Sequence, residues 1–462
     1  MSPTLAAASS TSPALPPSGA DTEAVDAAPA RGWRRWLSRG AWAMVDQAAF
    51  SVANFLVVLL LARWLSPDAF GRFAIAHTVF LLAATAYAAL CVDAMLVYGP
   101  NAYKSRLEKY FGAILLMQAP VALLTASGVA AVGGVLLLAG VAPLGWTVLA
   151  MAAATPMLLL LSLARRPCYV TLNPDRAAVG GLAYLALVTV ALFATAASGA
   201  LTVFSGIAVI GGVSLIVAVG LLARERWTFP LRSPDATISE VARDHWNYAR
   251  WAVASGLLGL LPSQLCYLVL PAATGDVEAS GALRATSNLI LPLIQANIAV
   301  GALLLPALSA TSTPTAGVDA AHRRRRLLFA GVGACVLIPA VAWVTLGLLG
   351  EPLLRLCYGD QYAHFGWLVW AIGAVPPLMG ASLVLNCWLQ SIRRQDAVFY
   401  SSLASAVTAA TLGVALTWHD QLRGAAVGVC ASIAVAIVIS AAFALGGSGG
   451  ASPTARARQG EG

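Results

Sequence analysis

Long apolar stretches recur along the chain, and short segments between them hold most of its charged residues. Each stretch reaches the roughly 20 residues that a helix needs to cross about 30 Å of hydrocarbon. A weak Ala-Ser-Gly-Ala break separates the fifth stretch from the sixth. The pattern predicts twelve membrane-spanning helices, at approximately 43–64, 71–98, 110–139, 146–165, 177–199, 201–223, 246–271, 280–310, 327–350, 365–391, 396–417 and 424–446.

The overall composition supports this prediction. The 462 residues are 59% hydrophobic and 10% charged, with a mean hydropathy of +0.79. A soluble chain carries roughly 25% charged residues, because its surface must face water. Most of this surface must therefore face lipid. The net charge of +8 does not indicate a nucleic-acid partner, because the basic residues lie between apolar stretches, where they set topology and contact membrane lipids.

The positions of lysine and arginine predict how the helices are oriented. If the N-terminus is cytoplasmic and the loops alternate, 23 of the 28 basic residues fall on the cytoplasmic side and 5 on the other. A wrong helix count would scramble this alternation. The five outer residues are Arg63, Arg72, Arg284, Arg355 and Arg423. We therefore expect a multi-pass protein of the bacterial inner membrane with both termini in the cytoplasm.

The chain also divides into two similar halves. Residues 61–76 and 270–285 each contain a short acidic turn, then a small residue or glycine, then an arginine at the outer start of the next helix. Six spans per half give both halves the same orientation, and repeats of this kind hold the substrate path between them. We thus expect an all-α polytopic membrane protein of two six-helix bundles, related by a pseudo-two-fold axis along the membrane normal. The predicted segments are a disordered cytoplasmic tail (1–30), an interfacial amphipathic helix (31–42), the N-terminal bundle (43–223), a cytoplasmic linker (224–245), the C-terminal bundle (246–446) and a second disordered cytoplasmic tail (447–462).

The sequence contains no recognisable catalytic motif. It has no P-loop, no HExxH and no GxSxG, and its five histidines are dispersed. The seven cysteines form no CxxC pair. We therefore expect neither an enzyme nor a bound metal or cofactor, and no ATP hydrolysis by this chain alone.

Polar residues within the apolar spans are candidates for function, because they are costly in lipid. Gln47, Ser51 and Asn54 share one face of the first span. Arg284 and Asn288, with Gln295 further along, share one face of the eighth. These two stripes predict a water-filled cleft between the halves. Two further arginines, Arg63 and Arg72, are predicted to lie near its outer side.

Arginine suits a phosphate-bearing substrate, because its planar fork binds phosphate oxygens in pairs. The alternative is that Arg63, Arg72 and Arg284 extend to the outer headgroups, and that Asn and Gln only tie helices together. Asp46, His77 and Asp93 are the intramembrane titratable groups that could couple transport to an ion gradient. Asp93 could instead pair with lysines of a nearby loop.

Two regions resemble bacterial polysaccharide-repeat-unit flippases of the Wzx type, in the multidrug/oligosaccharidyl-lipid/polysaccharide exporter superfamily. The first is 46–82, with an Ala62–Arg63 pair, a Leu-x-Pro turn at 65–67 and Phe-Gly-Arg-Phe at 70–73. The second comprises GALRATSNLILPL at 281–293 and LLLPALS at 303–309. The resemblance implies two bundles around a cleft and a substrate of undecaprenyl-diphosphate-linked oligosaccharide. It implies movement of that substrate to the periplasmic leaflet for lipopolysaccharide or exopolysaccharide synthesis, alongside other polysaccharide assembly proteins.

Two other functions remain open at this point. A drug/cation antiporter of the same superfamily would share the fold but would use acidic intramembrane groups such as Asp46 and Asp93. An integral-membrane polysaccharide polymerase or ligase would need a large periplasmic loop with basic catalytic residues. The longest predicted outer loop, 351–364, contains Arg355, Asp360 and His364 but is short for that purpose.

Overall fold

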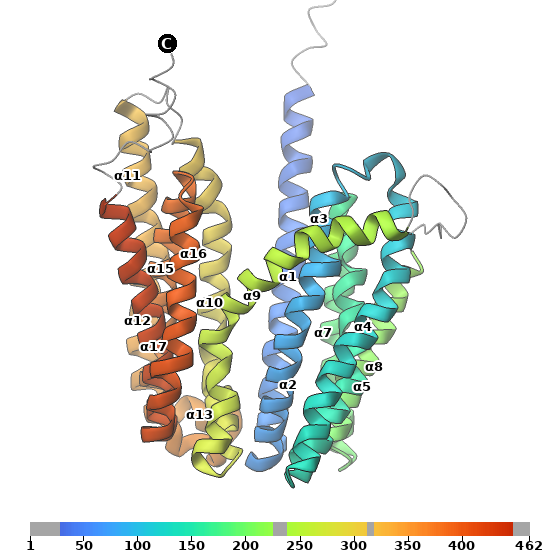
Figure 1. The fold of residues 1–462 in the computed structure, drawn as a ribbon, viewed down its shortest axis with the longest axis vertical. Helices are drawn as coiled ribbons and strands as arrows, with labels where there is room; N and C mark the ends of the chain where they lie inside the picture. The colour runs from blue at the N-terminus through green and yellow to red at the C-terminus, as the bar shows by residue number, and fades with distance from the viewer. Residues whose placement is uncertain (1–27, 225–237, 312–317, 447–462) are drawn as a thin grey trace, which may run out of the picture.

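The computed structural model describes residues 28–224, 238–311 and 318–446, and every regular element in these ranges is helical (Figure 1). Eleven helical stretches of the described residues are long and apolar enough to cross a membrane. Ten of them match the first ten predicted spans one for one. The eleventh, Gln395–Gly446, covers the last two predicted spans together.

The last stretch is a hairpin of two spans. It comprises α16 (Gln395–Thr408), the π-helix η5 (Ala409–Gly413) and α17 (Val414–Gly446). The helical path breaks at Asp420 and Gln421, where Gln421 has φ 46° and ψ −121°. Beyond the break the chain returns against itself, since a Cβ on Gly428 would lie 2.7 Å from the Cα of Gly413. The prediction of a twelve-span, all-α membrane protein is confirmed.

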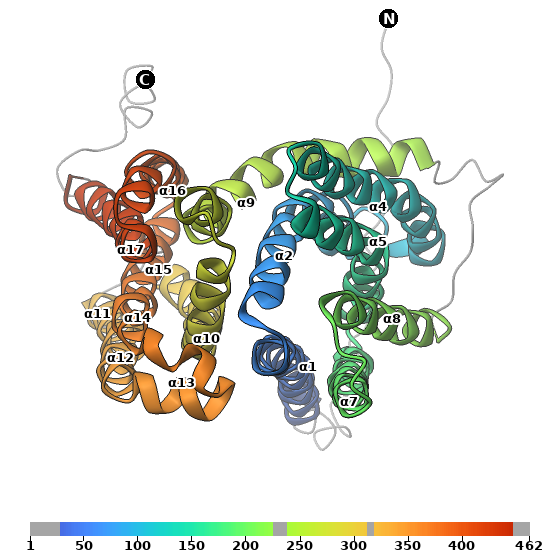
Figure 2. The ribbon, with the colours of Figure 1, turned by 90° about the horizontal axis from the view of Figure 1, so that it is seen from below.

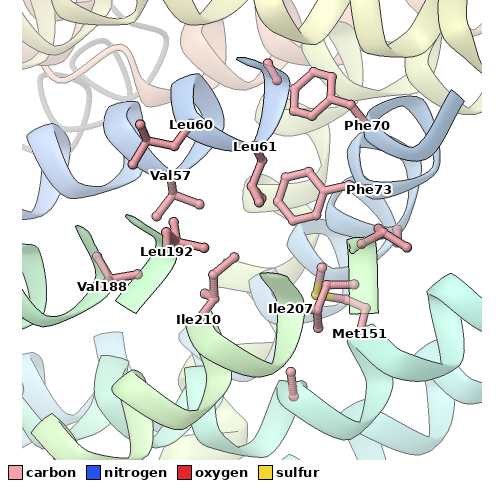
Figure 3. Close-up of a cluster of buried hydrophobic side chains, with 14 of the residues drawn as sticks. Val57, Leu60, Leu61, Phe70, Phe73, Met151, Val188, Leu192, Ile207 and Ile210 are labelled. Atoms are coloured by element: carbon pink, nitrogen blue, oxygen red, sulfur yellow. The ribbon is translucent and has the colours of Figure 1, made fainter. Parts of the chain in front are cut away.

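The first lobe consists of α1 to α8. Its elements are α1 (Ala28–Trp64), α2 (Pro67–Tyr87), η1 (Ala88–Asp93), α3 (Ala94–Tyr98), η2 (Lys104–Arg106), α4 (Leu107–Leu138), α5 (Ala142–Ala164), α6 (Arg166–Val170), α7 (Pro174–Ala197) and α8 (Val203–Leu222). Buried apolar side chains of α1, α7 and α8 meet at its centre, where Figure 3 shows Val57, Leu192 and Ile210. Burial of such a cluster holds the helices together mainly through close packing, because lipid is as apolar as the side chains.

The second lobe consists of α10 to α17. Besides α16 and α17 its elements are α10 (Glu278–Ala310), α11 (Val318–Val332), η3 (Gly333–Leu337), α12 (Ile338–Leu348), α13 (Gly350–Tyr358), η4 (Asp360–Phe365), α14 (Gly366–Gly373) and α15 (Val375–Ser391). Figure 2 shows the two lobes side by side, with α9 (Ile238–Thr274) crossing from one to the other. The predicted two-bundle architecture is confirmed.

The repeated acidic turn precedes α2 in the first lobe and α10 in the second. Ser66 caps α2 by accepting a hydrogen bond from the Ala69 backbone N–H at 3.3 Å, and Pro67 occupies the first turn. At the start of α10, Asp276 Oδ1 accepts from the Glu278 N–H at 2.8 Å. Both turns lie at the end of the molecule that carries α13, which we call the α13 end; the opposite end is the α11 end (Figure 1).

Two predicted segments differ from the helices observed. Residues 31–42, predicted as a separate interfacial helix, continue α1 without a break. Part of the predicted linker 224–245 is helical, because α9 begins at Ile238. Other parts of the predicted segments lie outside the described residues. These are residues 225–237 of the linker, the tail 447–462 and most of the tail 1–30.

Candidate functional site

The lobes touch where α2 crosses α10 at the α13 end. A Cβ on Gly71 would lie 2.2 Å from the carbonyl oxygen of Val277, and a Cβ on Gly281 would lie 3.1 Å from the Gly71 nitrogen. The two backbones can approach this closely because the residue at each of these two positions is a glycine, which has no side chain. The glycine in each repeated turn therefore lets the lobes meet.

Arg63, predicted as a substrate or headgroup contact, also lies in this contact between the lobes. Its Nη1 donates to the carbonyl oxygens of Leu356 at 2.8 Å and Cys357 at 3.1 Å, in the last turn of α13. The last carbonyls of a helix carry partial negative charge, so the guanidinium is well placed there. Gln361 of η4 donates in return to the Ala62 carbonyl of α1.

Arg284 of α10 points to α2 of the other lobe. Its Nη2 contacts His77 Nδ1, and its guanidinium carbon lies 5.4 Å from the centre of the Tyr267 ring. A guanidinium only donates hydrogen bonds, so His77 accepts through Nδ1 and is neutral in this arrangement. No carboxylate of the described residues forms an ion pair with Arg284.

Asn288 lies one turn further along α10, and it joins three helices. Its Nδ2 donates to the Phe55 carbonyl of α1 at 3.1 Å and lies 3.4 Å from the Tyr358 hydroxyl of α13. That hydroxyl donates to the Ala285 carbonyl at 2.8 Å. With 4% of its surface exposed, Asn288 ties helices together in this structure. Gln295, the third member of the predicted stripe, is half-buried.

The polar stripe on α1 is more open. Gln47 and Asn54 are exposed and Ser51 is half-buried. None of the three forms a side-chain hydrogen bond within the described part of the chain. Whether a ligand between the lobes contacts them stays a prediction.

The acidic candidates lie within the first lobe, paired with arginine. Asp46 is fully buried, and its Oδ2 accepts from Arg165 Nη2 at 2.6 Å and from the Tyr169 hydroxyl. Asp93, in η1, interacts electrostatically with Arg166. These pairs leave His77 as the titratable candidate that faces the other lobe.

Arg72 is similarly engaged close to the α13 end. Its Nη2 forms an ion pair with Asp68 of the preceding turn at 2.9 Å. Arg72 and Arg284, which the sequence analysis grouped as substrate contacts, therefore differ in their partners. Arg284 lacks a carboxylate within the described residues, whereas Arg72 has one.

The first turns of α9 provide a contact that the sequence analysis did not identify. His245 is fully buried, with Nε2 2.8 Å from the Tyr110 hydroxyl of α4 and Nδ1 2.7 Å from the Leu90 carbonyl of η1. The Tyr103 hydroxyl donates to Asp244 at 2.8 Å, close to the same contact. Asp244 and His245 are adjacent in the sequence of the predicted linker. These two polar side chains were the signal that this segment packs against another part of the protein.

Solved structures with the same fold are transporters and a flippase. One is an inward-facing multidrug resistance MATE family transporter of the MOP superfamily, with a TM-score of 0.69 and 11% identity over 86% of this chain and 96% of that one. Another is the lipid II flippase MurJ in an inward closed conformation, with a TM-score of 0.68 and 11% identity over 87% and 86%. An outward-facing MATE family transporter gives a TM-score of 0.58 and 14% identity over 88% and 93%. Neither a protein-family model nor a curated protein matches the sequence. The chain has the two-lobed fold of these transporters.

Proposed function

We propose that this protein is a flippase that moves undecaprenyl-diphosphate-linked oligosaccharide units from the cytoplasmic to the periplasmic leaflet of the inner membrane, for surface polysaccharide synthesis. Such a protein needs a path between its lobes that shields the sugar and the diphosphate while the prenyl tail stays in lipid. MurJ, which shares the fold, is a flippase for lipid II. On the predicted topology, the α13 end is periplasmic and the α11 end is cytoplasmic.

The observation that carries this proposal is the position of Arg284. It lies between the lobes, contacts a neutral histidine, and has no carboxylate partner within the described residues. A guanidinium in a low-dielectric environment is costly without an anionic partner. A diphosphate entering between the lobes would supply that partner and could bind the planar fork through two oxygens.

His77 is the group we propose for coupling to a proton gradient. A proton arriving at Nδ1 would convert the acceptor for Arg284 into a donor and place two positive charges side by side. Arg284 would then be released toward the substrate. Asp46 and Asp93 remain coupling candidates, although both already have an arginine partner.

A drug/cation antiporter remains the second candidate, because MATE family transporters share the fold equally well. A cationic substrate would need exposed acidic groups along the path. The pairing of Asp46 with Arg165 favours the flippase over this alternative.

The decisive experiment uses the purified protein in liposomes with a labelled prenyl-diphosphate oligosaccharide. We expect the lipid to change leaflet with no change in its mass and no need for added ATP. Arg284→Ala should reduce transport at least tenfold, and Arg284→Lys should restore part of it, because charge persists without the planar fork. Arg355→Ala is the matched control, since Arg355 is exposed and pairs within its own lobe with Glu351 and Asp360.

Other results would contradict the proposal. Longer glycan products would indicate a polymerase, and uptake of cationic dyes without lipid movement would indicate an antiporter. Full transport by a variant with both Arg72 and Arg284 replaced by alanine would exclude them as diphosphate partners.

A further inference from the structure

Arg324 of α11 has buried nitrogens that no group of the described chain satisfies. Its Nε and Nη2 are both buried without a hydrogen-bond partner in the described residues. Its guanidinium carbon lies 5.5 Å from the centre of the Trp388 ring of α15. Stacking on an aromatic ring offsets only part of the cost of burying a guanidinium, because it satisfies none of the N–H donors.

Three other arginines of the described residues have a buried nitrogen without a partner, but each has an acidic group nearby. Arg72 pairs with Asp68, Arg165 pairs with Asp46, and Arg166 interacts electrostatically with Asp93. Arg324 differs from all three, since no carboxylate among the described residues pairs with it. Arg324 is half-buried, and leaving its buried Nε and Nη2 donors without a partner is unfavourable, which points to an anionic partner from outside the described chain.

The surroundings of Arg324 indicate where that partner comes from. Arg323, Arg325 and Arg326 beside it are exposed, and Arg393 is exposed in the turn just after α15. About one to four turns further along the same stretch, Phe329, Leu337 and Ile338 each expose more than 60% of their surface, as expected of a face turned to lipid. The site therefore lies where a basic surface adjoins an apolar one, with a tryptophan between them, as at the edge of a bilayer.

We propose that Arg324 of α11 and Trp388 of α15 form a binding site for the phosphate group of an anionic phospholipid. The site lies toward the α11 end of the molecule, so the lipid belongs to the cytoplasmic leaflet. The guanidinium donates from its two free nitrogens, Nε and Nη2, to phosphate oxygens, and the exposed arginines around it attract the anionic headgroup. This site lies on the outer side of the second lobe, apart from Arg284, which faces α2. It does not depend on the identity of the transported substrate.

Binding of phosphatidylglycerol to the purified full-length protein in detergent tests this proposal. Native mass spectrometry should detect one retained phosphatidylglycerol, and this lipid, unlike phosphatidylcholine, should raise the melting temperature. Arg324→Gln should weaken binding roughly tenfold or more, as expected for the loss of a charged hydrogen-bond donor pair. Arg325→Gln removes the same charge from an exposed neighbour and should retain the bound lipid.

Two further measurements separate a specific site from a general effect on folding. In lipid-free detergent Arg324→Gln should melt at the same temperature as the wild type or higher, because it removes a half-buried charge whose Nε and Nη2 have no partner in the described residues. Arg324→Lys should bind the lipid at least threefold more weakly, since it keeps the charge but loses the fork.

Four results would overturn the proposal. Equal weakening in Arg324→Gln and Arg325→Gln would show that only the overall charge attracts the lipid. Undiminished binding by Arg324→Lys would show that no guanidinium site exists. Displacement of the lipid by millimolar inorganic phosphate would assign the site to free phosphate, and Arg324-dependent binding of a prenyl diphosphate in place of phosphatidylglycerol would assign it to the transported lipid.

Discussion

The two lobes are joined differently at the two ends of the molecule. At the α13 end, the contact uses the main chain: Gly71 lies against the Val277 carbonyl, and Arg63 donates to carbonyls of α13. Nearer the α11 end, α9 crosses between the lobes (Figure 2), and side chains such as His245 attach its first turns to the first lobe. A main-chain contact has no room for an added atom, whereas a side-chain contact can be weakened one hydrogen bond at a time.

This difference indicates how the lobes could move relative to each other. The first turns of α9 pack on η1 and α4, and its later turns pack on α16 and α17. A change in the angle between the lobes therefore requires α9 to bend. Pro262 and Pro271 lie within α9, and prolines are sites where a helix can kink. Opening of the α13 end, in contrast, must break the glycine contact and the Arg63 hydrogen bonds together.

The largest effect is expected from Gly71→Ala. The new Cβ would lie 2.2 Å from the Val277 oxygen, which forces α2 and α10 apart and disfavours the closed α13 end by roughly 3 kcal/mol, on the order of 100-fold. Cys357, half-buried beside this contact, provides the measurement. Burial raises the pKa of its thiol, so it reacts slowly while the end is closed. We expect its labelling by a charged maleimide to accelerate strongly in the variant.

Gly259→Ala is the control for this experiment. Gly259 lies within α9, and a Cβ there would meet nothing within 4 Å. The labelling of Cys357 should be unchanged in this variant. If Gly71→Ala also left the rate unchanged, the close approach of α2 and α10 would not hold the α13 end closed.

Arg63→Ala should have the next largest effect. It removes two hydrogen bonds from a charged donor to the end of α13, worth roughly 1.5–3 kcal/mol. Arg63 also lowers the pKa of the Cys357 thiol, so its loss alone would slow labelling. Faster labelling of Cys357, by roughly tenfold, would therefore report opening and not a change in thiol reactivity.

Arg355→Ala tests whether the position of the arginine matters. Arg355 belongs to the same α13 but pairs with Glu351 and Asp360 of its own lobe, and all three side chains are largely exposed. Exposed ion pairs contribute little, so labelling should change less than twofold. Equal effects of Arg63→Ala and Arg355→Ala would show that Arg63 acts only through the local charge.

The apolar pattern predicted the fold well, because the cost of exposing charge and main chain in lipid dictates helix length and number. The repeated turns at 61–76 and 270–285 also marked the place where the lobes meet, since their glycines allow close approach. The pattern could not show that 31–42 continues α1. Amphipathic basic residues are compatible with a separate surface helix and with an extension of a span.

The candidate site was predicted less completely than the fold. The role of a polar residue depends on the residues it contacts, and these can lie far away in the sequence. The sequence placed Asp46, His77 and Asp93 together as titratable groups. The structure gives Asp46 a partner 119 residues away, in Arg165, and brings His77 to Arg284 across 207 residues. Spacing along one helix identifies a shared face, as it did for Gln47 and Asn54, but not what lies opposite that face.

A smaller effect than that of Gly71→Ala or Arg63→Ala is expected from Tyr110→Phe, at the attachment of α9. The change removes the single hydrogen bond between the Tyr110 hydroxyl and His245 Nε2 and leaves the bond from Nδ1 to the Leu90 carbonyl in place. One such hydrogen bond is worth about 1 kcal/mol, so the first turns of α9 should open about fivefold more often. Hydrogen exchange of the α9 amides near His245 should be faster by that factor. Tyr400→Phe, at an exposed tyrosine of α16, should leave the exchange unchanged. Unchanged exchange in Tyr110→Phe would mean that the Leu90 carbonyl and Asp244 suffice to hold α9, whereas a loss of protection throughout the first lobe would mean that Tyr110 stabilises the lobe itself and not the attachment.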